Sequence, residues 1–211
     1  MDHAALWQRK VAGIRAVCDA LPTLQVSLEF KPTDEHTRWF AVPSTGAALL
    51  LCRDVDRPNF GLTLDVGHCL AAGENPAQSV ALVAAQGKLF GVQLNDGYTR
   101  LGAEDGLCFA SAHPSMALEV VVWLVKAHFQ GHCYFDTFPR NEDPVKEAAR
   151  NILTAQRLWA RATDLLRPQL PRSEASAGGV AGGDDADSSS VLNSVWRTHD
   201  GLAALDLADG K

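Results

Sequence analysis

Four short apolar runs, each followed by a helix-like stretch, constrain the fold of this chain more than any other feature. The runs cover residues 26–31, 61–68, 89–96 and 133–138, and each is bounded by proline, glycine or polar residues. Strands that alternate with helices are typical of a parallel sheet whose crossover helices lie outside it. We therefore expect an α/β fold that contains four strand–helix units.

Local signals predict where the helices begin. Residues 4–21 carry apolar side chains at helical spacing and end before Pro22. Ser44 is a suitable N-cap for a helix through residues 49–51. Three further helices are expected where a polar residue precedes a proline, at Asn75-Pro76, His113-Pro114 and Asp143-Pro144. The last of them should run from Val145 to about Leu166.

The chain changes character after Leu166. Residues 167–211 are rich in glycine, serine and aspartate and should form a flexible tail, with a candidate short helix at 191–207. A complete (β/α)₈ TIM barrel takes about 250 residues, and only four units plus a leading helix fit before the tail. We therefore expect residues 1–166 to form half a barrel, equivalent to strands 5–8.

Composition excludes several classes of protein. The 211 residues are 46% hydrophobic, enough for one domain with a core, and 25 acidic against 19 basic residues give a net charge of −6. That charge argues against nucleic acid as a partner. We expect no membrane partner, because no apolar run reaches about 18 residues and the N-terminus lacks a signal-peptide pattern. Five dispersed cysteines without CxxC spacing indicate reduced thiols and a cytoplasmic location.

Each predicted strand ends in a polar side chain. These side chains are Glu29, Asp65, Gln93 and Asp136. Because loops at the C-terminal ends of parallel strands carry the chemistry of such folds, these groups should converge on one point. Converging oxygen ligands usually hold a hard divalent cation. The sequence therefore predicts a metal site with Lys31 and His68 beside it.

Each of these motifs also has an ordinary interpretation when taken alone. Glu29 and Lys31 share one strand face and could form a simple ion pair, and a lone His68 is more often structural than a ligand. Glu104 and Asp105 could form a solvated turn. The serial placement of a polar group at every strand end favours the functional interpretation, because chance does not produce it.

With these residues in view, the chain resembles the xylose-isomerase-like TIM-barrel superfamily of sugar isomerases and epimerases. The resemblance covers about residues 26–152, corresponds to the second half of the barrel, and is strongest to the xylose and rhamnose isomerase branches. The matching motifs are Glu29-x-Lys31, Asp65-x-x-His68, the acidic pair Glu104-Asp105, and Asp136 within Tyr134–Pro139. Two features depart from the family: Gln93 stands where a histidine or aspartate ligand is usual, and the first four strands are absent.

The resemblance implies a metal-dependent aldose–ketose isomerase with two divalent ions, Mn²⁺ first and Mg²⁺ or Co²⁺ as alternatives. One ion would bind Glu29, Asp65, Gln93 and Asp136, and the second, which promotes a hydride shift, would bind His68, Glu104 and Asp105. Lys31 and His68 would be catalytic. The sugar-binding residues would be Lys31, Asn95, Phe138 and Arg140.

Three alternatives remain open at this point. The first is a one-metal epimerase of the same superfamily, which Lys31 and the short Asp136 disfavour. The second is the related three-zinc endonuclease branch, which a single histidine in the constellation disfavours. The third is a catalytically inactive binding or assembly module. The expected partners are a small sugar and either a second copy of the chain or a missing N-terminal half.

Overall fold

The computed structural model describes residues 1–33, 36, 39–100 and 104–167, so the predicted tail lies almost wholly outside the described residues. The described residues form ten elements. They are α1 (His3–Ala20), β1 (Val26–Glu29), α2 (Thr45–Val55), β2 (Phe60–Asp65), α3 (Val66–Ala71), α4 (Pro76–Ala85), β3 (Leu89–Gln93), α5 (Pro114–Lys126), β4 (His132–Tyr134) and α6 (Pro144–Leu166).

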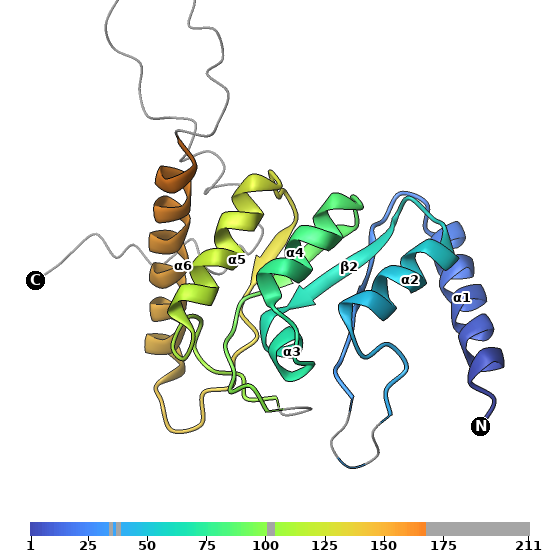
Figure 1. The fold of residues 1–211 in the computed structure, drawn as a ribbon, viewed down its shortest axis with the longest axis horizontal. Coiled ribbons are helices and arrows are strands. Elements are labelled where there is room, and N and C mark those ends of the chain that lie inside the picture. The colour runs from blue at the N-terminus through green and yellow to red at the C-terminus, as the bar shows by residue number, and fades with distance from the viewer. Residues whose placement is uncertain (34–35, 37–38, 101–103, 168–211) are drawn as a thin grey trace, which may run out of the picture.

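The strands form one parallel sheet in the order β1-β2-β3-β4, which confirms the predicted α/β class. Figure 1 shows the helices covering one side of this sheet, with α1 and α6 at opposite ends of the layer. No helix in the described part of the chain is long and apolar enough to cross a membrane.

The helix starts follow the capping chemistry of the sequence. Ser44 accepts a hydrogen bond from the backbone N–H of Ala47 at 3.2 Å, and Asn75 accepts one from Gln78 at 3.0 Å. Asp143 caps α6 by accepting from Val145 at 2.9 Å. These side chains satisfy N–H groups that have no partner within the helix. The predicted helix starts are therefore confirmed at these positions.

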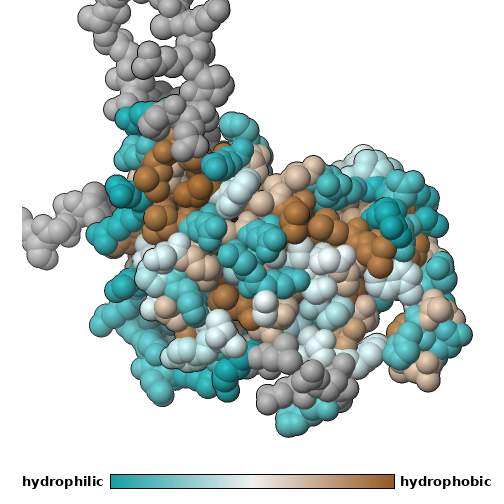
Figure 2. Space-filling view, viewed as in Figure 1, coloured by the Kyte–Doolittle hydropathy of each residue, from teal (hydrophilic) through white to brown (hydrophobic). Residues whose placement is uncertain are grey.

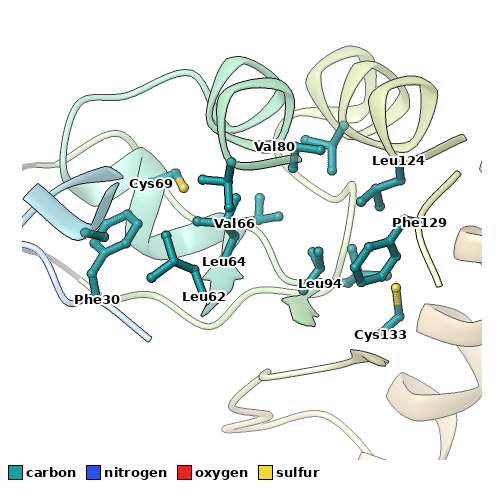
Figure 3. Close-up of a cluster of buried hydrophobic side chains, with 14 of the residues drawn as sticks. Phe30, Leu62, Leu64, Val66, Cys69, Val80, Leu94, Leu124, Phe129 and Cys133 are labelled. Atoms are coloured by element: carbon teal, nitrogen blue, oxygen red, sulfur yellow. The ribbon is translucent and has the colours of Figure 1, made fainter. Parts of the chain in front are cut away.

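Strand alternation produces the core. Leu62, Leu64 and Val92 are fully buried, and Figure 3 shows Leu62 and Leu64 within the apolar cluster that includes Val80 of α4 and Leu124 of α5. Successive side chains of a strand point to opposite faces. The residues that alternate with these buried apolar residues therefore face away from the helices. Thr63, Asp65 and Gln93 are such residues. The packing of the apolar face thus determines which polar groups reach the other face.

Candidate metal centre

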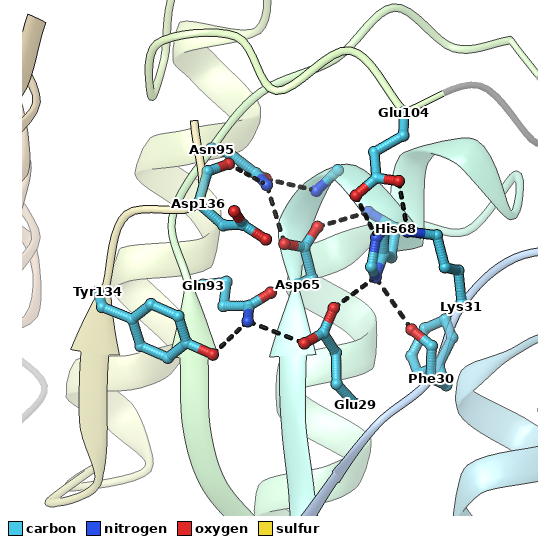
Figure 4. Close-up of polar contacts among 11 residues, drawn as sticks. Glu29, Phe30, Lys31, Asp65, His68, Gln93, Asn95, Glu104, Tyr134 and Asp136 are labelled. Carbon is cyan, nitrogen blue, oxygen red and sulfur yellow. Dashed lines mark hydrogen bonds and ion pairs between the residues drawn. The ribbon is translucent and has the colours of Figure 1, made fainter. Parts of the chain in front are cut away.

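The polar groups of the site come from neighbouring positions on adjacent strands. Asp65 of β2, Gln93 of β3 and Tyr134 of β4 are register partners, so their side chains lie in one row across the sheet. Glu29 ends β1 and pairs in register with Thr63, two residues before Asp65. Figure 4 shows the carboxyl and amide groups of Glu29, Asp65 and Gln93 pointing toward one another.

Asp65 ends its strand and at the same time begins a helix. Its Oδ1 accepts a hydrogen bond from the backbone N–H of His68 at 2.7 Å, so it is the N-cap of α3. The strand-like run of residues 61–68 is a strand only as far as Asp65, because the Asp65 cap starts a helix at Val66. The helical first turn still directs the His68 ring back toward the strand ends.

His68 is buried between acceptor oxygens. Its Nδ1 lies 3.0 Å from Glu29 Oε1 and 3.0 Å from the carbonyl oxygen of Phe30, and its Nε2 lies 3.1 Å from Glu104 Oε1. Acceptors at both ring nitrogens favour the doubly protonated imidazolium. Burial opposes that charge, but the hydrogen bonds to Glu29 and Glu104 and the charge of Asp65 outweigh it and raise the pKa of His68 to about 9.

The two carboxylates beside His68 respond in opposite ways. The hydrogen bond from His68 is the largest influence on Glu29 and holds its pKa below the usual value, despite partial burial. Asp65 is 1% exposed, and this burial raises its pKa to about 6, although His68 and Asn95 favour its charged form. A buried carboxylate with a raised pKa gains most from a nearby cation.

Asn95 connects the ends of three strands. Its Nδ2 donates to Asp65 Oδ2 and to the backbone oxygen of Asp136, both at 2.9 Å, and its Oδ1 accepts from the backbone N–H of Gly67 at 2.7 Å. The side chain is 4% exposed. Asn95, which the sequence predicts to bind the sugar, binds neighbouring groups through both ends of its amide in this structure.

Gln93 presents an amide oxygen to the centre of the cluster. Its Nε2 donates to Glu29 Oε2 at 2.9 Å and to the hydroxyl oxygen of Tyr134. Its Oε1 is buried and has no hydrogen-bond partner among the described residues. Figure 4 shows this oxygen directed toward Asp65. Buried polar atoms nearly always have a hydrogen-bond partner. An amide oxygen without one, beside carboxylates, therefore indicates a position where a cation could bind.

The loop after β3 brings Glu104 to the site and turns Asp105 away from it. Lys31 Nζ forms an ion pair with Glu104 Oε2, while the other oxygen of Glu104 faces His68. Partial burial raises the pKa of Glu104, but Lys31 and His68 more than offset this and lower it overall. Asp105 instead pairs with Arg100 at 2.9 Å and accepts from the N–H of Tyr98 at 2.7 Å. Of the acidic pair predicted from the sequence, Glu104 therefore lies at the site and Asp105 points away from it.

The segment that follows β4 contributes Asp136, Phe138 and Arg140. Figure 4 shows the Asp136 carboxylate pointing toward Asp65, and burial, together with the negative charges of Glu29 and Glu104, raises its pKa. Phe138 and Arg140 line a cavity of about 700 Å³ that is bounded by the loops that follow β3 and β4 and by the start of α6. The residues that line this cavity do not include the carboxylates of the cluster, so it lies beside the candidate metal centre.

The residues at the centre fit a divalent cation. Ligand atoms of Glu29, Asp65 and His68 lie within 4.8 Å of one another. Gln93 adds the unpartnered amide oxygen, which is an independent indication of a ligand, and Asp136 adds a further carboxylate. Carboxylate and amide oxygens are suitable ligands for Mn²⁺ or Mg²⁺.

Tyr134 is a residue of the site that the sequence prediction omitted. It stands two positions before Asp136 and therefore shares its strand face, as Glu29 does with Lys31. The same alternation argument could have found it. Its phenol was overlooked because it is neither a carboxylate nor an amide.

Known proteins with similar sequences or structures support the barrel interpretation. The family model described as a xylose isomerase-like TIM barrel matches residues 2–161. A xylose isomerase of Streptomyces lividans is 28% identical over 191 residues, which is 88% of this chain and 45% of the relative. The chain thus spans about half the length of that curated relative.

Two of the similar solved structures illustrate the shared fold. A xylose isomerase domain protein of Alicyclobacillus acidocaldarius has a TM-score of 0.60 at 21% identity, over 77% of this chain and 61% of that one. A structure of L-ribulose 3-epimerase has a TM-score of 0.55 at 16% identity, over 80% of this chain and 59% of that one. At these identities the likeness concerns the fold alone, which is the fold that the sequence predicted.

Proposed function

This chain belongs to the xylose isomerase-like TIM-barrel family, and from that premise we propose that it is a metal-dependent isomerase that interconverts an aldose and a ketose. The proposal is supported by the ligand atoms of Glu29, Asp65 and His68, which lie within 4.8 Å of one another, together with the buried, unpartnered amide oxygen of Gln93. The substrate class that we propose is a small sugar. A cytoplasmic location agrees with five free cysteines, four of which are buried.

The ligands that we propose for the first ion are Glu29, Asp65, Gln93 and Asp136, with Mn²⁺ as the preferred ion and Mg²⁺ or Co²⁺ as alternatives. When bound, a divalent ion there would polarise a sugar carbonyl and stabilise negative charge on its oxygen. For a second ion we propose Glu104 and His68, whose imidazolium would release the Nε2 proton on binding the cation. Asp105 belongs to that proposal only if it exchanges its contacts with Arg100 and Tyr98.

The side chains around the ligands supply charge and hydrogen bonds. Lys31 projects from the end of β1 to Glu104 and provides a cation that can donate a hydrogen bond to a developing alkoxide. His68 holds a proton on Nδ1 between Glu29 and Phe30, which fixes its ring. We propose that Phe138 and Arg140, at the neighbouring cavity, contact the distal part of the sugar.

Metal titration and product analysis test this proposal. We expect Mn²⁺ to bind the wild-type chain in calorimetry and to bind the Glu29→Gln and Asp136→Asn variants at least about 10-fold more weakly, because both variants lose a charged ligand. Glu119→Gln, an exposed residue of α5, is the matched control and should bind like the wild type. Equal affinity in both site variants would refute the first ion site.

The products distinguish the reaction classes. Incubation of the Mn²⁺-loaded chain with a panel of aldoses and ketoses should convert one sugar type into the other. Conversion of a ketose into its epimer instead would support the epimerase alternative. Metal binding without either conversion would contradict isomerase activity in this chain and support a binding module.

A further inference from the structure

We propose that Tyr134 is a positioning residue for the candidate metal centre, because its hydroxyl holds the Gln93 amide with Oε1 facing Asp65. The inference rests on the proposed function, since it concerns how this chain orients a ligand for the ion. Gln93 is neutral, so unlike a carboxylate it has only one end that can bind a cation. The orientation of its amide therefore decides whether the ligand is present.

Both hydrogens of the Gln93 amide are engaged, one by Glu29 at the centre and one by Tyr134 at its edge. Glu29 Oε2 lies 2.9 Å from Nε2 and can only accept, and the hydroxyl oxygen of Tyr134 receives the second N–H. With both donors bound, Oε1 is left without a partner among the described residues. The row Asp65–Gln93–Tyr134 is set by strand register, so Tyr134 is placed beside Gln93 by the sheet itself.

The surrounding charges favour the opposite orientation. Asp65 lies beside Gln93 in the row, and Figure 4 shows the Asp136 carboxylate on the same side. These carboxylates would attract the amide NH₂ and would repel Oε1. Glu29 and Tyr134 counter this by binding the NH₂ from the other side. If the Tyr134 hydroxyl is removed, one buried N–H loses its acceptor, and rotation of the amide toward Asp65 or Asp136 restores a hydrogen bond.

The Tyr134→Phe variant removes the hydroxyl and keeps the ring. We expect Mn²⁺ to bind about 10-fold more weakly, as is usual when a residue that orients a metal ligand is lost. Tyr98→Phe is the matched control, since Tyr98 is the only other tyrosine of the sequence and its side chain is exposed. Melting curves recorded with EDTA should show that both variants remain folded.

A double-mutant cycle separates positioning from a general structural effect. In a Gln93→Met background there is no amide to orient, so the additional Tyr134→Phe change should leave the remaining Mn²⁺ affinity unchanged. If Tyr134→Phe weakens binding equally in both backgrounds, or in neither, the inference is overturned. If the wild-type chain itself does not bind Mn²⁺, the proposed ion site fails and the inference fails with it. Wild-type binding with an unaffected Tyr134→Phe variant overturns the inference alone.

Discussion

The ring of His68 connects the ionisation of the site to the stability of the fold. Its Nδ1 and Nε2 face Glu29 and Glu104, so the native state favours the imidazolium more than the unfolded chain does. The pKa of His68 is raised from 6.5 to about 9. A group whose native pKa is raised stabilises the fold fully below its unfolded pKa, and this contribution is lost as the pH rises through the native pKa.

We therefore predict that, in the presence of EDTA, the wild-type chain loses stability between pH 6.5 and about 9. A His68→Gln variant should be less stable than the wild type at pH 6 and should show a flatter dependence across this interval. Urea unfolding at several pH values measures the difference. Parallel curves for the two proteins would show that His68 does not carry the imidazolium in the native state.

At the scale of elements, the loop between β3 and α5 is closed at its base by one buried carboxylate. Asp96 is fully buried and accepts hydrogen bonds from the backbone N–H groups of Gly97, Ala112 and His113, all between 2.8 and 2.9 Å. The Nδ1 of His113 lies 2.8 Å from the same carboxylate. Two backbone hydrogen bonds between Asp96 and Leu107 complete the closure. Glu104 is therefore held on a loop with a fixed base.

We predict that Asp96→Asn destabilises the protein by about 1–3 kcal/mol, because the amide nitrogen cannot accept and leaves buried N–H groups unpartnered. Asp56→Asn, at the end of α2, should change the free energy of unfolding by less than about 0.5 kcal/mol. Chemical denaturation of the three proteins makes the comparison. A loss of stability no larger in Asp96→Asn than in Asp56→Asn would mean that the loop does not depend on this carboxylate.

The sequence predicted the elements better than the connections between them. Helix starts at Thr45, Pro76, Pro114 and Pro144 follow from local capping and proline signals, which need no tertiary information. Helix α3 was missed because Asp65 serves as strand end and helix cap at once. His113 precedes α5 as predicted, but its side chain forms no cap hydrogen bond and binds Asp96 instead.

In the candidate site, too, residues on strands were predicted better than residues on loops. Period-2 alternation placed Glu29, Asp65 and Gln93 on one face, and the structure brings them together. The different directions of Glu104 and Asp105 depend on contacts with Lys31 and Arg100 across the loop, which spacing alone does not encode.

At the scale of the whole molecule, the sheet has two open edges in the part of the chain that the structure describes. β1 and β4 each pair on one side only. Apolar side chains are exposed in the last turn of α1 and the segment between α1 and β1, at Val17, Leu21 and Leu24, and along α6, at Leu153 and Leu165. On the helix-covered face, Figure 2 shows hydrophobic areas over α6 and between α2 and α4. Open strand edges with exposed apolar neighbours favour pairing with another chain.

We predict that the 211-residue chain, purified alone, forms a dimer in which β4 of each copy lies beside β1 of the other. This arrangement has two-fold symmetry, gives eight parallel strands and leaves neither edge open. Light scattering after size exclusion should give about twice the 22.7 kDa of one chain. A double change, Leu21→Lys with Leu24→Lys, should shift the protein toward monomer, whereas Leu82→Lys, on the outer side of α4, should not.

Isomerase turnover should decrease as the dimer dissociates, since the four strands of one copy supply only part of a barrel mouth. A stable monomer with full turnover would show that one copy of the four-stranded sheet is sufficient.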